Sequence, residues 1–369
     1  MKESKNILIC PLEWGLGHAA RMIPLARMLR EMNNNVLIGS GEKHLALFRA
    51  ELPGLTYINF SGFRPVYSRY FPQYLVLLLE TPLLLYHIIH EHLRLKSIIR
   101  ENAIDIVISD NRFGLWNNNV TTVYVTHMPR IPLPKPLRFL ERIGVRLHRA
   151  VMKRYSFCFI PDLPGELNVS GRLSHGVNLP DNARFTGILS RFTFFKEPIP
   201  GNPINFQHNT VILSGPEPQR EMLKQKLTSL LKEQEPPTVM LGGRPDKPNE
   251  IVKSGNIIYY NHLASQEMRE MLTGSNCIIS RSGYTTIMDL ISINKHALLI
   301  PTPGQTEQEY LAGYLTEKGW FSTVSQGEIK RGMTMPSKEV QWTKEIIERS
   351  LVLLTEALNE LLEKNHKNG

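Results

Sequence analysis

The sequence has 369 residues, of which 42% are hydrophobic and 21% are charged, and its formal net charge is +9. This length predicts two domains that each bury a core, and the composition is that of an ordinary soluble protein. The three cysteines stand far apart in apolar surroundings, which indicates buried thiols in a reducing compartment and excludes a disulfide framework or a cysteine metal cluster.

The sequence predicts neither a signal peptide nor a membrane span. Residues 1–5 lead directly into an apolar strand, and the longest apolar run, residues 74–89, is interrupted by Glu80 and Pro82. We therefore expect a cytoplasmic protein that is not integral to a membrane. Peripheral contact with the inner face of the cell membrane is left open.

The first elements of the chain predict a doubly wound domain. An apolar strand at residues 6–10, a glycine loop and a helix through Met32 lead to a second strand at residues 36–39. Gly15 and Gly17 let the acceptor-side loop turn tightly over a ligand, but no third glycine completes a dinucleotide fingerprint. His18 falls at the helix start and the sheet edge, where it could be a general base or a donor to a phosphate. The alternative is a histidine that only caps the helix.

Two later strands, at residues 104–109 and 122–126, end in Asp110 and His127. In a doubly wound order both side chains face the crevice of His18, so they are secondary catalytic candidates. A loop cap and a satisfied histidine are the alternatives. Before these strands, residues 74–100 predict a long apolar helix broken near Pro82, which we expect in the core under the sheet rather than at a membrane interface.

Most of the positive charge lies in one segment. Residues 112–154 hold nine Lys or Arg against the single acid Glu141, a net charge of +8. The cations alternate with apolar residues, which is typical of a solvated helix face or of contact with an anionic membrane. Because residues 138–154 have few aromatic side chains, we expect no nucleic-acid partner and favour a membrane surface or a lipid-linked acceptor.

A Pro-rich stretch at residues 191–207 predicts a linker between two domains. Beyond it, strands at residues 210–213, 238–241 and 256–260 each end in a polar loop. We expect an N-terminal acceptor-side domain at residues 1–190, a C-terminal donor domain at 208–339, and a helix and tail at 340–369.

The most informative unit is residues 276–310, which predict a strand, a polar turn, a helix and another strand. The free N–H groups and positive dipole at the start of such a helix form a seat for a phosphate. Ser282, Thr285 and Thr286 add hydroxyl donors there, and Gly283 lets the backbone come close. Asp289 lies one turn further on the same face, where a carboxylate can accept both hydroxyls of a ribose.

This unit resembles the donor signature of glycosyltransferase family 28, on residues 281–283, Thr286, Asp289, the strand ending in Pro301 and residues 308–310. The resemblance implies the α/β fold called GT-B, in which two doubly wound, Rossmann-like domains face a central cleft, with the last helix returning to the first domain. It also implies that Asp289 holds the ribose and that Gln308 and Glu309 meet the donor sugar. Glu309 and Ala312 depart from the family pattern, which leaves the identity of that sugar open.

The same resemblance implies that Gly215 and Arg244 lie near the diphosphate and His262 near the base. No Asp-x-Asp motif occurs. We therefore expect no metal and no cofactor, and helix dipoles with Arg244 or Arg281 would stabilise the leaving nucleotide.

The first hypothesis is a glycosyltransferase that moves a sugar from a nucleotide-sugar donor, with UDP as the expected nucleotide, to a membrane-associated or polyprenyl-linked acceptor. His18 or Asp110 would take the proton of the acceptor hydroxyl. One alternative is a nucleotide-sugar hydrolase or 2-epimerase of the same fold, because the loop at residues 15–21 resembles the corresponding loop of a hydrolase branch. Another is a non-catalytic nucleotide-sugar-binding protein.

Overall fold

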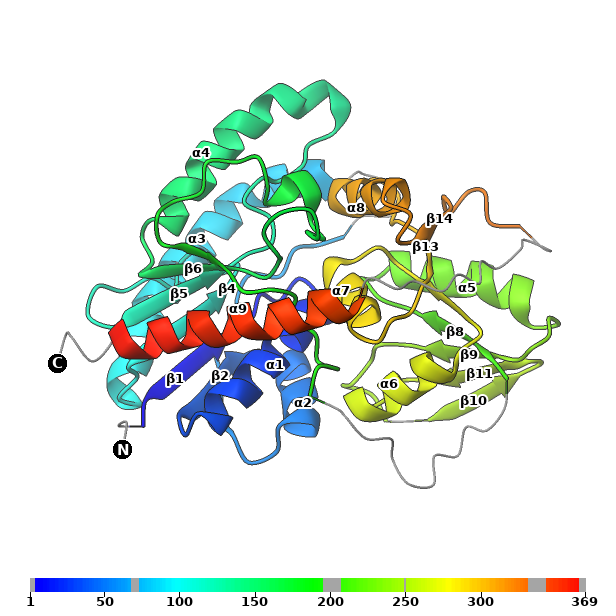
Figure 1. Cartoon of the computed structure of the whole chain (residues 1–369), viewed down its shortest axis with the longest axis horizontal. Coiled ribbons are helices and arrows are strands. Elements are labelled where there is room, and N and C mark those ends of the chain that lie inside the picture. Colours follow the sequence, from blue (N-terminus) through cyan, green and yellow to red (C-terminus); the bar gives the residue numbers. More distant parts are fainter. Residues whose placement is uncertain (1–3, 68–72, 195–206, 249, 331–342, 365–369) are drawn as a thin grey trace.

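The computed structural model describes residues 4–67, 73–194, 207–248, 250–330 and 343–364. These residues form two seven-stranded sheets with helices on their faces (Figure 1). The first sheet has the order β3-β2-β1-β4-β5-β6-β7 and the second the order β10-β11-β9-β8-β12-β13-β14. All neighbouring strands are parallel except β10 and β11. This architecture confirms the predicted α/β fold with two Rossmann-like sheets.

The inner strands of the first sheet are short, apolar and buried on both faces, as covered parallel strands are, whereas its two edge strands are partly exposed. Its strands are β1 (Asn6–Cys10), β2 (Asn35–Ser40), β3 (Thr56–Asn59), β4 (Ile106–Asp110), β5 (Thr121–Val125), β6 (Phe157–Ile160) and β7 (Ala183–Phe185). The helices of this part are α1 (Leu16–Glu31), α2 (Glu42–Glu51), α3 (Gln73–Glu101) and α4 (Glu141–Met152), with the 3-10 turns η1 (Lys135–Leu140) and η2 (Gly171–Leu173).

The second sheet repeats this plan with an antiparallel strand at one edge. Its strands are β8 (Asn209–Ile212), β9 (Thr238–Leu241), β10 (Ile251–Ser254), β11 (Ile257–Tyr260), β12 (Cys277–Ser280), β13 (Leu298–Leu299) and β14 (Ser322–Thr323). The helices are α5 (Gln219–Leu231), α6 (Ser265–Gly274), α7 (Tyr284–Ser292) and α8 (Thr306–Glu317), and α9 (Thr343–Lys364) ends the described chain.

Helix α9 packs against β7 of the first sheet and against α7. Figure 1 shows it lying along the first half of the molecule, and Arg184 of β7 donates two hydrogen bonds of 2.8 Å to Glu360. The limits at residues 190, 207 and 339 stay a prediction, because residues 195–206 and 331–342 lie outside the described parts of the chain.

Helix α3 differs from the expectation in two ways. It runs without a break through Pro82, and the expectation of a core helix is wrong for its N-terminal two thirds, where Leu79 is 82% exposed and Leu78 is 68% exposed. At about 1.5 Å per residue a helix of 29 residues is roughly 43 Å long, whereas a strand of five residues spans only about 17 Å. Only the last turns of α3, with Leu95 and Ile98, can therefore reach the sheet. None of the helices in the described ranges combines the length and apolarity of a bilayer-spanning segment.

In each sheet the first strand in chain order lies inside the sheet, and later strands are added first on one side of it and then on the other. β1 pairs with β2 on one side and β4 on the other, and β8 pairs with β9 and β12. Ligands of open α/β sheets bind outside the carboxyl ends of the strands at such a point. The loops that begin after β1, β4, β8 and β12 therefore mark where a site is expected.

Candidate active site

A cleft of about 530 Å³ opens at these loops and is lined by residues of both halves. Its size lies within the range of roughly 300 to 1,000 Å³ that is typical of small-molecule sites. The predicted residues that line it are Gly15, Gly17, His18, His127, Gly215, His262, Gly283, Thr285, Thr286, Asp289 and Gln308. The fold thus brings side chains more than 250 residues apart in the sequence to one cavity.

His18 and Asp110 form a hydrogen-bonded pair on the first-domain side. Nδ1 of His18 lies 2.9 Å from Oδ2 of Asp110, which ends β4 and is fully buried. Burial alone would raise the pKa of the Asp110 carboxyl, but Arg21 and His18 beside it lower that pKa to about 2, so the group is ionised at neutral pH. Burial lowers the pKa of His18, and Asp110 opposes that effect. Nη2 of Arg21, which can only donate, also lies 2.9 Å from Nδ1 of His18. In the tautomer in which Nδ1 carries the proton and donates it to the Asp110 carboxylate, Nε2 keeps a lone pair that can accept a proton.

Arg21 holds this pair from one turn further along α1. Its Nε donates to Oδ2 of Asp110 at 3.0 Å, and its Nη2 donates to Oδ1. Its Nη1 lies 2.9 Å from Nδ1 of His127. Arg21 is buried, so these contacts compensate a charge that has no access to water.

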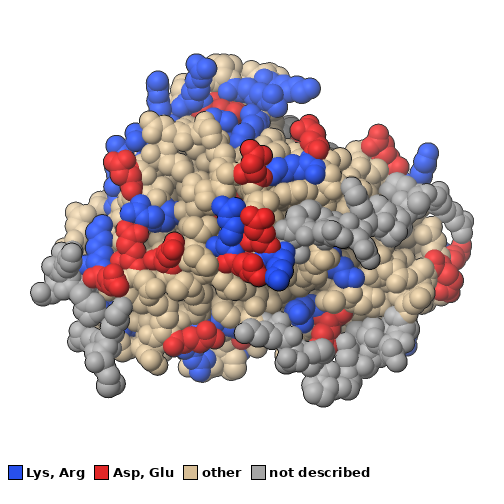
Figure 2. All heavy atoms as spheres, viewed as in Figure 1, with Lys and Arg blue, Asp and Glu red and all other residues tan. Residues whose placement is uncertain are grey.

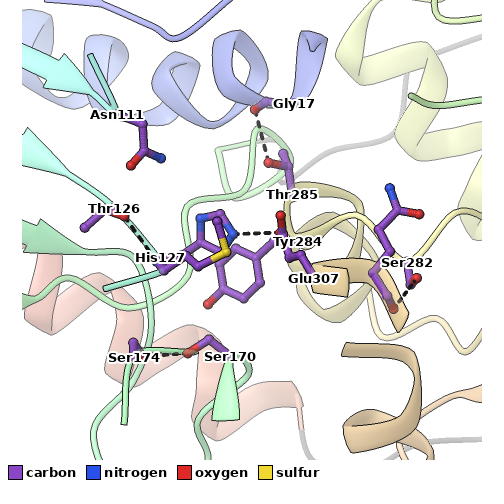
Figure 3. A network of polar contacts seen from close by, with 12 residues as sticks. Gly17, Asn111, Thr126, His127, Ser170, Ser174, Ser282, Tyr284, Thr285 and Glu307 are labelled. Atoms are coloured by element: carbon purple, nitrogen blue, oxygen red, sulfur yellow. Dashed lines mark hydrogen bonds and ion pairs between the residues drawn. The ribbon is translucent and has the colours of Figure 1, made fainter. Parts of the chain in front are cut away.

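His127 uses both of its ring nitrogens. Because Arg21 can only donate, Nδ1 of His127 accepts, and Nε2 therefore carries the proton and donates it to Oε1 of Glu307 at 2.9 Å. Figure 3 shows this contact, together with the ring of Tyr284, which stacks on His127 at 4.3 Å. His127 is predicted from the sequence as a secondary catalytic candidate, and in this geometry neither of its ring nitrogens is left to accept a proton. It links the two halves of the cleft instead.

On the second-domain side the cleft meets the N-terminus of α7. Gly283, Thr285 and Thr286 line it there, and Oγ1 of Thr285 donates to the Gly17 carbonyl at 3.1 Å (Figure 3). A Cβ atom at Gly17 would lie 3.1 Å from that hydroxyl oxygen, so any larger residue would force Thr285 to shift where the two loops approach each other.

Asp289 lies one turn further along α7. Its carboxylate is buried and accepts hydrogen bonds from two residues at the end of the first half. Oγ of Ser190 donates to Oδ1 at 2.8 Å, and Nε of Arg191 donates to Oδ2 at 3.0 Å. Burial raises the pKa of Asp289, and Arg191 and Ser190 oppose the rise. His262 also lines this end of the cleft, and burial, assisted by Arg191, lowers its pKa to about 4.

Four predicted donor residues do not line the cleft. Arg281 is fully buried and donates to the carbonyls of Ile300, Pro301 and Gln219. Its guanidinium therefore holds loops together and is not available to a leaving nucleotide. Oγ of Ser282 donates to the Gln308 carbonyl (Figure 3), so it does not point at a phosphate.

The other two are Arg244 and Glu309. Nη2 of Arg244 donates to Glu217 at 2.8 Å, and Oε1 of Glu309 accepts from the Gly304 amide at 2.8 Å. Gln308 does line the cleft, but its Oε1 accepts from the amide of Thr302 at 2.9 Å. The side chains expected to meet the donor sugar are thus engaged in shaping the loop after β13.

Three residues of the site were missed from sequence: Arg21, Arg191 and Glu307. Arg21 had a local signal, because it follows His18 by three positions and so shares its helix face. Arg191 and Glu307 had no such local signal in the sequence, since their partners in the site are 98 and 180 residues away. Only the tertiary fold brings such contacts together.

Known proteins resemble the chain over all or part of its length. Residues 222–365 match the family model described as the glycosyltransferase family 28 C-terminal domain. An uncharacterized glycosyltransferase of Methanosarcina acetivorans is 22% identical over 69% of this chain and 68% of its own length. The UDP-N-acetylglucosamine–N-acetylmuramyl-(pentapeptide) pyrophosphoryl-undecaprenol N-acetylglucosamine transferase of Thermosipho africanus is 28% identical over 30% of this chain and 34% of its own length.

Solved structures share the fold over nearly the whole chain. The glycosyltransferase SnogD from Streptomyces nogalater has a TM-score of 0.57 at 15% identity and covers 99% of this chain and 98% of its own. The calicheamicin glycosyltransferase CalG4 has a TM-score of 0.58 at 10% identity, with coverage of 99% and 98%. The match over residues 222–365, the glycosyltransferase relatives and the shared GT-B fold identify the chain as a glycosyltransferase.

Proposed function

We propose that the protein transfers a sugar from a UDP-linked donor to a polyprenyl-linked or other membrane-borne acceptor. One observation carries the proposal: a single cleft is lined by His18 of the first half, which is paired with the buried Asp110, and by the N-terminus of α7 in the second half. A proton acceptor and an anion seat in one cavity are the two parts that glycosyl transfer from a nucleotide sugar needs.

The donor would lie along α7. Its diphosphate would accept hydrogen bonds from the free N–H groups of the first turn and from the hydroxyl of Thr286. Asp289, already oriented by Arg191, would accept the ribose hydroxyls, and His262 would lie toward the base. As the bond from C1 of the sugar to the diphosphate breaks, the positive dipole end of α7 stabilises the charge that develops on the leaving nucleotide.

The acceptor would approach from the first half. Nε2 of His18 takes the proton of its hydroxyl while the oxygen forms the new bond to C1. Asp110 then stabilises the imidazolium that results. Such a positioned base contributes about 10² to 10⁴ in rate.

The surface of the first half supports a membrane-borne acceptor. Phe139, Ile143 and Leu147 follow one another at helical spacing, and Phe139 is 70% and Leu147 66% exposed. The cations that surround this stripe are Lys135, Arg138, Arg142 and Arg146, all exposed. Figure 2 shows Lys and Arg gathered at the top of the molecule, where Figure 1 places α4. Apolar side chains rimmed by cations are typical of a helix that lies in the headgroup region of anionic lipid.

Helix α3 extends this surface. Its exposed apolar side chains include Leu79 and Tyr86, and Trp116 connects it to the end of α4 by stacking on His92 at 4.2 Å and lying under Arg154 at 5.3 Å. One member of the predicted basic segment does not belong to it. Arg112 is buried and donates to Glu91 at 3.2 Å, so its charge is neutralised inside the fold.

The test is a nucleotide-release assay on the purified protein with UDP-N-acetylglucosamine, UDP-glucose, UDP-galactose and GDP-mannose. Each donor is supplied in buffer, with vesicles of anionic phospholipid, and with the same vesicles carrying a polyprenyl-linked glycolipid fraction. We expect UDP release from one UDP-sugar only with the glycolipid, together with a product that gains the sugar. Release in buffer alone would identify a hydrolase or 2-epimerase, and binding without release would identify a sensor.

A further inference from the structure

Among the described residues, five Lys or Arg side chains line the cleft, and the fold neutralises four of them. Each of the four is an arginine in an ion pair with a carboxylate: Arg21 with Asp110, Arg64 with Glu13, Arg191 with Asp289 and Arg220 with Glu217. The fifth is Lys43 of α2, which makes no hydrogen bond or ion pair with another described residue. Lys43 is also exposed, so its ammonium group can meet a ligand in the cleft.

Helix α2 is held against the second half by its C-terminal end. Glu51, the last residue of α2, accepts from the amide and the hydroxyl of Ser265 at 2.7 Å each, so a carboxylate of the first half caps α6. Leu47 and His44 lie on the same face of α2, four and seven residues before Glu51, and both line the cleft. Lys43 adjoins His44 and lines the cleft as well. The face of α2 that meets α6 therefore continues along the cleft to Lys43.

The charges around Lys43 show which part of the second half it faces. Burial lowers the pKa of Lys43, and Arg220 and Arg244 lower it further, whereas Asp246 and Glu217 raise it. All four side chains belong to the segments that follow β8 and β9. Lys43 therefore lies across the cleft from the loops at the ends of these two strands.

The loop after β8 adjoins the proposed seat of the donor diphosphate. β8 pairs with β12 in parallel, so the loop after β8 and the turn before α7 leave the sheet side by side. Gly215 of that loop and Gly283 of that turn both line the cleft, and a Cβ atom on either would meet no described atom within 4 Å. A diphosphate at the N-terminus of α7 thus has room on the side that Lys43 faces.

The arginines of the second half that could serve a diphosphate are bound elsewhere. Arg281 donates to backbone carbonyls, and Arg244 donates to Glu217. Arg220 donates to Glu217 and to the carbonyl of Gly243. Among the described residues of the cleft, an unpaired positive side chain for the diphosphate therefore comes from the first half.

We propose that Lys43 donates a hydrogen bond to the diphosphate of the donor and stabilises the leaving nucleotide from the first half. The inference rests on the proposed function and adds a catalytic residue to it. As the bond between C1 of the sugar and the phosphate oxygen breaks, its electron pair stays on that oxygen, and the acceptor oxygen forms the new bond to C1. The proton of the acceptor hydroxyl goes to Nε2 of His18, and Lys43 keeps its own proton. An ammonium group beside the oxygen that gains charge lowers the barrier together with the dipole of α7.

The test compares the wild type with Lys43→Met, which keeps the length of the side chain without its charge, and with Lys43→Arg, which keeps the charge. Dissociation constants are measured for UDP by calorimetry and for uridine by ligand-observed NMR, because uridine reports the base and ribose contacts without the phosphates. UDP release at saturating donor gives kcat, and thermal unfolding checks the fold. Arg49→Met is the control on the same helix, since Arg49 pairs with Glu42 at 2.9 Å and does not line the cleft.

We expect Lys43→Met to weaken UDP binding about tenfold or more and to lower kcat by a similar factor, because a charge-assisted hydrogen bond is lost. Uridine affinity should stay within about twofold of the wild type. Lys43→Arg should keep most of the UDP affinity and of kcat, and Arg49→Met should leave all three quantities unchanged.

Equal losses for UDP and uridine in Lys43→Met would show a structural role, and unchanged UDP affinity or unchanged kcat would equally overturn the assignment. A higher KM for the glycolipid acceptor with unchanged UDP affinity would assign Lys43 to a phosphate of the acceptor and overturn the donor contact. If the wild type itself bound no UDP, the proposed function would fail before any variant was compared, which separates that outcome from a failure of Lys43 alone.

Discussion

Replacing Asp110 by Asn removes a buried charge while keeping the shape of the side chain. In the folded protein the pKa of Asp110 is about 2, against 3.8 for an unperturbed aspartate. At about 1.4 kcal/mol per pKa unit this difference corresponds to a net stabilisation of about 2 to 3 kcal/mol from Arg21 and His18. The variant also leaves Arg21 buried without its carboxylate. Breaking a buried pair in this way costs about 3 to 5 kcal/mol, so we expect a loss of that size in the free energy of unfolding.

The fall in activity of Asp110→Asn should be larger than the fall in the amount of folded protein. Asparagine at position 110 has no charge to stabilise the imidazolium of His18, and its NH2 group can donate to Nδ1 and favour the wrong tautomer. We therefore expect kcat to fall by about 10² to 10⁴ in protein that is still folded. Asp110 raises the pKa of His18. The acid limb of the pH–rate profile should therefore move to lower pH in the variant.

The assays are urea unfolding, UDP release under saturating donor, and UDP affinity by calorimetry. Because the folded pKa of Asp110 is depressed, its contribution to stability is full above about pH 4 and disappears as the pH falls to about 2. The stability gap between wild type and variant should narrow over that window. Asp105→Asn is the control, since this carboxylate accepts from the Asn6 amide just before β4, at the end of the strand away from the cleft. An unchanged kcat in folded Asp110→Asn would refute the assignment of the pair as the base.

Three further perturbations test other parts of the site. Asp289→Ala should weaken UDP binding by roughly 10- to 100-fold, because it removes a charged acceptor and leaves its arginine unpaired; unchanged UDP affinity would end the ribose assignment. Gly17→Ala should lower kcat/KM roughly tenfold, since its methyl group would lie 3.1 Å from a hydroxyl oxygen of α7 and loosen the cleft; wild-type kinetics would show that the approach is not required. The double change Arg142→Glu and Arg146→Glu should weaken binding to anionic vesicles, measured by sedimentation, by more than tenfold, because each cation near the lipid contributes about 1 kcal/mol. The control Lys344→Glu on α9 should leave vesicle binding unchanged, and equal effects of the two changes would contradict a membrane face at α4.

The corrected expectations share a physical origin. The pattern of α3 predicts an apolar helix but not whether its apolar face meets a sheet or solvent, and the outcome follows from its length relative to the strands. The composition around Arg281 and Ser282 predicts a polar turn before a helix, and that is observed. Which way each side chain leaves the turn depends on the loop after β13, which no local pattern describes.

What the sequence by itself determined was the order of most strands and helices, the polar turn at the start of α7 and the glycine loop that carries His18. These features depend on contacts between residues close in the chain, such as helix N-termini, turn residues and runs of apolar residues. Only the tertiary structure decided that Arg21 joins Asp110 to His127, that Arg191 orients Asp289, and that Glu307 faces the cleft. The contacts involved join residues from about 90 to 180 positions apart, and their geometry exists only once both sheets have packed and their loops share one crevice.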